Sequence, residues 1–233
     1  MTAAAALPFP VTPRRTAQEP EADLFGFALV HRALRTGCRL LADAVSSVAA
    51  GSPCGPDRQR AIVAFAGHML HEVHVHHSRE DDVLWPVITA SAGAHVDLAP
   101  LTDDHAALQG VLDRAETLLA TFAAQGPAAA APLAAVLTQV ADALDEHIAE
   151  EERDVFPVVR RYVSAGDFAR VETRFRKGTS LRHMVFVLPW IVDSCATPED
   201  RAQLLGSAPP PLRLLLRVVG PRWERRRDLV RGP

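Results

Sequence analysis

The sequence has few of the residues that build sheets. Aromatic residues make up only 6% of its 233 residues, with a single tyrosine, and runs of β-branched residues are scarce. Hydrophobic residues make up 48%, and alanine and leucine dominate them. This balance favours an all-helical protein.

Cysteine is also scarce, with only Cys38, Cys54 and Cys195, which lie far apart in the sequence. An odd number without paired spacing argues against a disulfide framework. The spacing also matches no zinc finger or zinc ribbon. We therefore expect the reducing environment of the cytoplasm.

Long apolar runs are absent, because none reaches the roughly 18 residues that cross a bilayer. We therefore expect no membrane association. Near the start of the chain, Arg14 and Arg15 follow the apolar part, whereas in a secretory signal the basic residues come first. We expect residues 1–20 to form a disordered leader.

Four long segments carry apolar residues at steps of three or four, the period of a helix with one buried face. They cover residues 22–49, 57–90, 97–124 and 129–163. Short breaks rich in glycine and proline separate long helices that must then be antiparallel neighbours. The pattern predicts an all-α protein with an antiparallel up-down four-helix bundle over residues 21–163.

The remaining part, residues 164–233, has short helical pieces separated by prolines. We expect additional short helices over 167–176, 180–193 and 198–206, packed on the bundle. Residues 201–233 hold eight arginines against two acidic residues, so this extension is basic. A solvated helix face is the simplest interpretation, nucleic acid is an unlikely partner, and an acidic protein partner is an open alternative.

Polar residues interrupt the apolar stripe of every predicted bundle helix. They are His31, His76, Glu80, His105, His147 and Glu151. A buried carboxylate is costly unless it is paired or bound to a metal. His76 and Glu80 are four residues apart, as are His147 and Glu151, so each pair lies on one helix face. Cations could satisfy both carboxylates and all four imidazoles together.

An internal repeat supports this grouping. Residues 76–87 align without gaps to residues 147–158, with coincident histidine, glutamate, following acid, aromatic residue, proline and valine. A lone histidine precedes each copy, His31 before the first and His105 before the second. Each half of the bundle would therefore bring three ligands to one centre.

These motifs resemble the hemerythrin and HHE cation-binding family, especially its bacterial members. The resemblance spans about residues 22–163 and rests on His31-Arg-Ala-Leu-Arg35, His76-His-x-x-Glu80-Asp, His105 and His147-x-x-x-Glu151. It implies two non-haem iron ions, with the four histidines as terminal ligands and the two glutamates as bridges. Imidazole and carboxylate also suit manganese or zinc.

One departure from the family bears on function. Oxygen-carrying hemerythrins have five histidines, two of them one turn apart on the third helix, but here Leu101 and Gln109 flank His105. We therefore expect an open metal position that binds O₂, peroxide or NO, with redox activity. The alternatives are an iron or oxygen sensor that signals through its C-terminal region, and a metal-storage bundle. Candidates for outer positions around the metals are Glu72, His77 and Gln109.

Overall fold

The computed structural model describes residues 7–12, 14–177 and 180–233. Within these ranges the secondary structure is helical and contains no strand, which confirms the all-helical prediction. Its elements are α1 (Phe25–Ala49), α2 (Pro56–Arg79), η1 (Glu80–Leu84), α3 (Trp85–Ala92), η2 (Gly93–His95), α4 (Ala99–Gln125), η3 (Gly126–Ala129), α5 (Ala130–Tyr162), α6 (Ala165–Arg176), α7 (Leu181–Asp193), α8 (Pro198–Ser207) and α9 (Pro210–Arg231).

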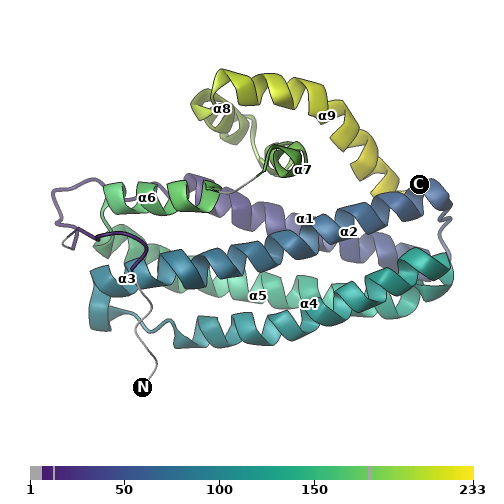
Figure 1. Ribbon diagram of the computed structural model, residues 1–233, viewed down its shortest axis with the longest axis horizontal. Coiled ribbons are helices and arrows are strands. Elements are labelled where there is room, and N and C mark those ends of the chain that lie inside the picture. The colour runs from purple at the N-terminus through teal and green to yellow at the C-terminus, as the bar shows by residue number, and fades with distance from the viewer. Residues whose placement is uncertain (1–6, 13, 178–179) are drawn as a thin grey trace.

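The four long helices α1, α2, α4 and α5 lie side by side and make the body of the molecule (Figure 1). Contacts join α1 to α2, α2 to α4, α4 to α5 and α5 back to α1. The helix of α2 continues through η1 into α3. Each predicted long segment agrees with the observed helical stretch to within three residues at either end. We call these four helices, with η1 and α3, the bundle.

The apolar core is divided into two clusters along the bundle. The larger contains residues such as Leu34, Phe65, Leu112 and Leu144, and the smaller contains residues such as Trp85 from the end nearest α3 and α6. In sequence, the polar stripe positions of α1, α2, η1 and α4 fall between the two clusters, and on α5 only Ile148 of the larger cluster follows His147. A polar layer therefore lies between two apolar layers, where water has little access.

One apolar stretch within Ala99–Tyr162 could span a membrane by length and composition alone, and half of it is buried. It belongs to α4 and α5. The apolar residues of these two helices form much of the bundle core. Packing inside the protein is therefore sufficient to explain the hydrophobicity of this stretch.

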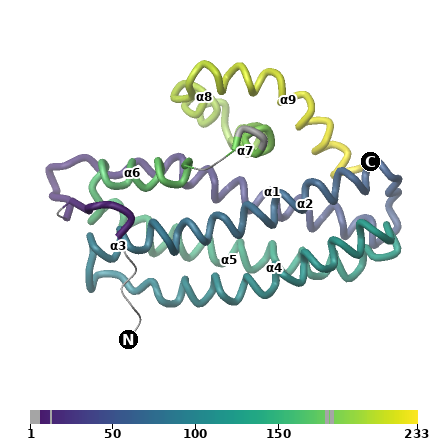
Figure 2. Tube along the Cα trace, in the orientation of Figure 1, coloured from purple at the N-terminus to yellow at the C-terminus, as the bar shows by residue number. Residues whose placement is uncertain are grey.

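The C-terminal region packs on one side of the bundle. Figure 1 and Figure 2 view α7 nearly end-on above the horizontal bundle, so α7 crosses the long helices, and α9 arches back over it. Helices α6, α7 and α8 agree with the predicted short pieces. The prediction of only short helices is wrong for α9, which has 22 residues. Its first two residues are prolines, which are tolerated in the first helical turn and had suggested a break.

The described part of the predicted disordered leader (1–20) lies against α5 and α6. The Thr12 amide donates to the Asp167 carboxylate at 2.9 Å, and the Arg15 amide donates to the Tyr162 carbonyl at 3.1 Å. These bonds join the described part of the leader to α6 and to the end of α5. The remainder of the leader lies outside the described residues.

Candidate metal centre

The polar layer consists of seven buried side chains from α1, α2, η1, α4 and α5. They form two groups whose nitrogen and oxygen atoms lie within 4.8 Å of one another in each group. The first group contains His31, His76, Glu80 and Glu151, and the second contains His77, Glu80, His105 and His147. All six residues predicted as ligands are therefore brought together, and His77 joins them.

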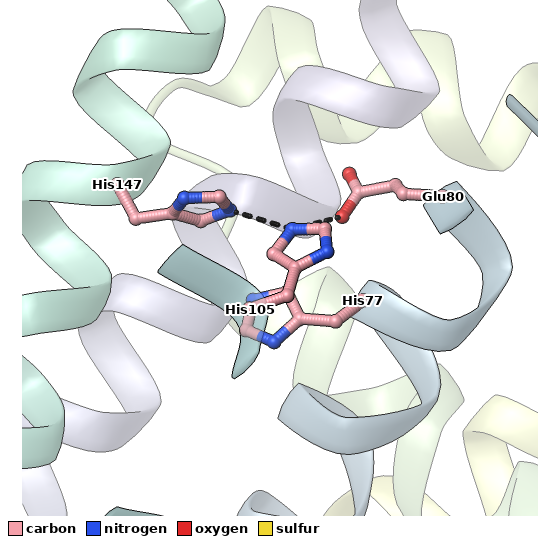
Figure 3. A group of neighbouring side chains, drawn as sticks. All are labelled: His77, Glu80, His105 and His147. Atoms are coloured by element: carbon pink, nitrogen blue, oxygen red, sulfur yellow. Dashed lines mark hydrogen bonds and ion pairs between the residues drawn. The ribbon is translucent and has the colours of Figure 1, made fainter. Parts of the chain in front are cut away.

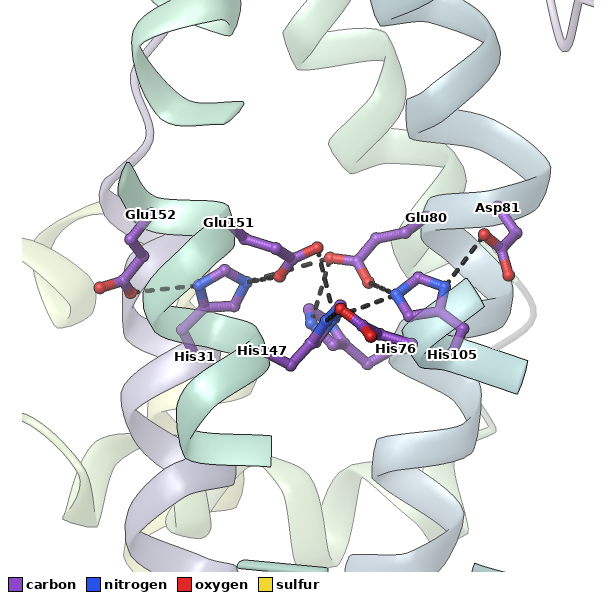
Figure 4. A network of polar contacts seen from close by, with 9 residues as sticks. His31, His76, Glu80, Asp81, His105, His147, Glu151 and Glu152 are labelled. Atoms are coloured by element: carbon purple, nitrogen blue, oxygen red, sulfur yellow. Dashed lines mark hydrogen bonds and ion pairs between the residues drawn. The ribbon is translucent and has the colours of Figure 1, made fainter. Parts of the chain in front are cut away.

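In the first group, both carboxylates face imidazole nitrogens. His76 Nε2 lies 3.1 Å from Glu80 Oε1, and His31 Nε2 lies 3.4 Å from Glu151 Oε2. His31 Nε2 is also 3.9 Å from Glu80 Oε1. Figure 4 shows the two carboxylates meeting between the histidines.

In the second group, His105 lies at the centre (Figure 3). Its Nε2 is 3.6 Å from Glu80 Oε2 and 3.0 Å from His147 Nε2. The His77 ring stacks on the His105 ring with centroids 4.2 Å apart. Glu151 Oε1 lies 3.6 Å from His147 Nε2. Glu80 and Glu151 therefore each direct one oxygen toward the first group and the other toward the second.

Most of the inward-facing atoms lack a hydrogen-bond partner. These buried atoms are Nε2 of His31, His76 and His77, and both carboxylate oxygens of Glu80 and Glu151. Buried polar groups without partners cost free energy, and buried carboxylates cost the most. Two divalent cations, one in each group, would satisfy these atoms at once. The donor set of imidazoles and carboxylates thus fits a pair of metal ions.

Two further carboxylates support the outer nitrogens of the lone histidines. Asp81 Oδ1 lies 3.0 Å from His105 Nδ1, and Glu152 Oε1 lies 3.1 Å from His31 Nδ1. When Nδ1 donates its proton to such a carboxylate, Nε2 is left free to bind a metal. The internal repeat contains an acid directly after each glutamate, but helical periodicity alone does not indicate this supporting contact.

The comparison with protein families agrees with this geometry. The model of the hemerythrin HHE cation-binding domain matches residues 26–159, more than half of the chain. The chain belongs to this family. No curated protein and no solved structure matches the chain. The matched range contains the whole polar layer of the hemerythrin domain and ends before α6, so α6 to α9 lie outside it.

Burial controls the protonation of the polar layer when no metal is bound. Burial as the larger cause and neighbouring histidines as the second lower the pKa of His77 to about 2 and that of His147 to about 3. Burial raises the pKa of Glu151 to about 8, and it raises the pKa of Glu80 well above its usual range, with Glu151 as the second cause. His77 and His147 are therefore neutral near pH 7, ready to donate lone pairs, while the two carboxylates hold protons that a cation would displace.

A widened helical turn lies at the layer. The π-helical turn η1 begins at Glu80, and the Trp85 amide donates to the Glu80 carbonyl, five residues back. Pro86 has no amide hydrogen, so it cannot make the regular bond to the carbonyl four residues earlier. Such π-turns are frequent at functional sites because the extra residue redirects side chains. Here the turn contains both Glu80 and the supporting carboxylate of Asp81.

The three residues predicted for outer positions have different surroundings. His77 is 5% exposed and lies in the layer itself. Glu72 makes an ion pair with His183 of α7. Gln109 contacts His74 at 2.9 Å and donates to Asp113 at 2.7 Å on the surface. The polar partners described for Glu72 and Gln109 lie outside the layer, so an outer position around the metals stays a prediction for both.

A groove of about 590 Å³ between α4 and α5 reaches the polar layer from outside. His147 lies at its inner end, and Asp104, Glu146 and Glu150 are among its lining residues. The His147 ring is buried, but it is the layer residue that this groove contacts. Arg114 and apolar residues such as Leu108 and Val111 also line the groove, which leads from the surface to His147.

Proposed function

We propose that this hemerythrin-family protein holds two non-haem iron ions in the polar layer. His31 and His76 would bind one ion, and His77, His105 and His147 would bind the other. Glu80 and Glu151 would bridge them. The buried atoms without partners carry this proposal, because each faces one of the two groups. The family suggests iron, while manganese and zinc accept similar ligands.

An iron pair, when bound, supplies redox chemistry and positions that accept O₂, peroxide or NO. The chain orients the ligands and excludes water. The Phe27 and Phe156 rings lie 4.5 and 5.5 Å from the His31 ring, and Trp85 stacks 6.1 Å from His105. These rings shield the layer from the end of the bundle nearest α3, so small ligands would arrive through the groove beside His147.

The two sides of the proposed centre differ in histidine number. With His77 the layer has five histidines. His77 thus takes the place of the second histidine that the sequence lacks one turn from His105. The side of His31 and His76 then has one protein nitrogen fewer than the other. We propose that this side keeps the position for a small ligand, in place of the side of His105 that the sequence pattern had suggested.

The test is metal analysis of protein from iron-replete cells, followed by rapid mixing of the anaerobic reduced protein with O₂. We expect about two iron ions per chain, fast oxidation, and turnover of peroxide or NO. A long-lived adduct that releases O₂ under vacuum would instead indicate a carrier or a sensor. Zinc alone, without iron uptake, would overturn the proposal. The His147→Ala variant lacks one proposed ligand of the polar layer. The metal that wild type binds and this variant loses is therefore the metal of the layer.

A sensor is the second candidate, and one contact favours it. Glu72 lies one helical turn before His76 and pairs with His183 on α7, which lies outside the family match. A change at the centre could reach the basic C-terminal region through α2. Metal- or O₂-dependent binding of a partner would support this function. We also propose a cytoplasmic location, which agrees with the free thiols of the three cysteines.

A further inference from the structure

A third group of metal-binding side chains lies outside the centre, between α2 and α7. It contains His71, Glu72 and His183, whose ligand atoms lie within 4.8 Å of one another. Glu72 is buried at 8% exposure, and its Oε1 atom contacts His183 Nε2. The His71 ring lies edge-on to the His183 ring at 5.3 Å. Two imidazoles thus meet one buried carboxylate.

We propose that His71, Glu72 and His183 bind a divalent cation of the zinc class, separate from the two ions of the bundle centre. Two histidines and one carboxylate are a common three-ligand set for zinc, in which water completes the coordination. His71 is exposed and His183 is half-buried, so a cation reaches the site directly from solvent. None of the three residues belongs to the polar layer, so the site does not depend on the centre.

The fold fixes the relative position of these ligands. His71 and Glu72 follow one another on α2, and His183 lies in the first turn of α7. Ser180 caps that turn by accepting a hydrogen bond from the His183 amide at 3.2 Å. The ligands therefore come from two helices that are far apart in sequence. A bound cation would hold α7, and with it the C-terminal region, against the bundle.

A simple ion pair is the competing explanation for this contact. It requires only Glu72 and a protonated His183, and it gives His71 no role. The cation site requires His71 as a ligand. Replacement of His71 separates the two, because its side chain is exposed and its loss should leave the fold intact.

The experiment titrates metal-free, full-length protein with Co²⁺ and then Zn²⁺, following Co²⁺ absorption and the number of ions bound. Wild type should bind one ion more than His71→Ala or His183→Ala, or bind it at least tenfold more tightly. His74→Ala is the matched control, because His74 is an exposed histidine on the same helix and should leave binding unchanged. Zn²⁺ should also slow proteolysis of the C-terminal region in wild type but not in His71→Ala.

The His147→Ala variant distinguishes this site from the centre. It should lose metal from the polar layer and still bind the ion that His71→Ala loses. Equal stoichiometry and affinity in wild type, His71→Ala and His183→Ala would overturn the proposal. Loss of this ion in His74→Ala would also overturn it.

Discussion

His77 and Ile148 occupy equivalent positions of the internal repeat, and both side chains are buried. The His77 ring stacks on His105 at 4.2 Å, whereas Ile148 packs in the apolar core with no exposed surface. The other ligand positions of the repeat are matched. This single difference gives one side of the proposed centre three histidines and the other side two.

Replacing His77 with isoleucine should make the two sides alike. We expect His77→Ile to fold, since isoleucine is accepted at the equivalent position, but to bind one of its two iron ions at least about tenfold more weakly. Iron content after dialysis against a competing chelator measures this. His74→Ile changes an exposed histidine of the same helix and should bind iron as wild type does. Unchanged iron retention in His77→Ile would remove His77 from the ligand set.

The supporting carboxylates should matter although they are not proposed to contact metal. Asp81→Asn and Glu152→Gln each keep the side-chain size but weaken the acceptor for the Nδ1 proton of a ligand histidine. We expect each to lower iron affinity by about 10–100-fold. Asp82→Asn is the control, because Asp82 is exposed in the same π-turn. If Asp82→Asn lowers iron affinity equally, the loss of affinity comes from the removal of negative charge near the site. The individual contacts to the histidines are then not its cause.

The sequence was sufficient to predict the long helices and six residues of the layer, because helical periodicity and the repeat both report the buried face. It placed His77 only at an outer position and not in the layer, because His77 lies about 100° from His76 around an ideal helix. The buried face of a bundle helix is wide enough for both directions. His76 faces His31 of α1 at 5.1 Å between ring centroids, and His77 faces His105 of α4. Neighbouring residues thus reach opposite sides of one layer.

Contacts between elements that are far apart in the sequence could not be predicted from helical periodicity. Glu72 fell on the stripe of the layer residues, which suggested a position around the metals, but its partner is His183 of α7. Periodicity reports which face of a helix is buried and does not report which element covers it. The same reason hid the ordered contacts of the leader with Asp167 and Tyr162.

Close packing of α7 on α1 predicts a sensitivity at Gly37. A Cβ atom there would lie 3.0 Å from Trp190 Nε1 and 2.8 Å from Met69 Cε. Gly37→Ala should therefore lower the free energy of unfolding by about 1–3 kcal/mol, despite the better helix propensity of alanine. Gly67→Ala, on α2, meets no atom within 4 Å and should raise it by about 0.5–1 kcal/mol. Chemical denaturation measures both, and the same sign for both would contradict the packing argument.

The buried layer also predicts how stability depends on pH when metal is absent. His77 and His147 have folded pKa values of about 2 and about 3, below their ordinary 6.5, so the unfolded chain binds more protons and their contribution to stability rises with pH up to about 6.5. Glu151 has a folded pKa of about 8, above its ordinary 4.5, and Glu80 is shifted in the same direction. The folded protein binds more protons there, so the glutamate contribution falls as pH rises from about 4.5 to 8.

Burial also lowers the pKa of His31 and His76, so the histidine effect outweighs the glutamate effect below pH 6.5. The metal-free protein should therefore have its greatest stability near pH 6.5, with a decline toward pH 8. Bound cations compensate both carboxylates, so the decline should disappear in the metal-loaded protein. Glu151→Gln removes one of the titrating groups and should flatten the decline without metal. Denaturation of both forms between pH 5 and pH 9 provides the measurement. A metal-free protein that gains stability from pH 6.5 to pH 8 would mean that the layer carboxylates are already ionised, and that cation binding releases no proton from them.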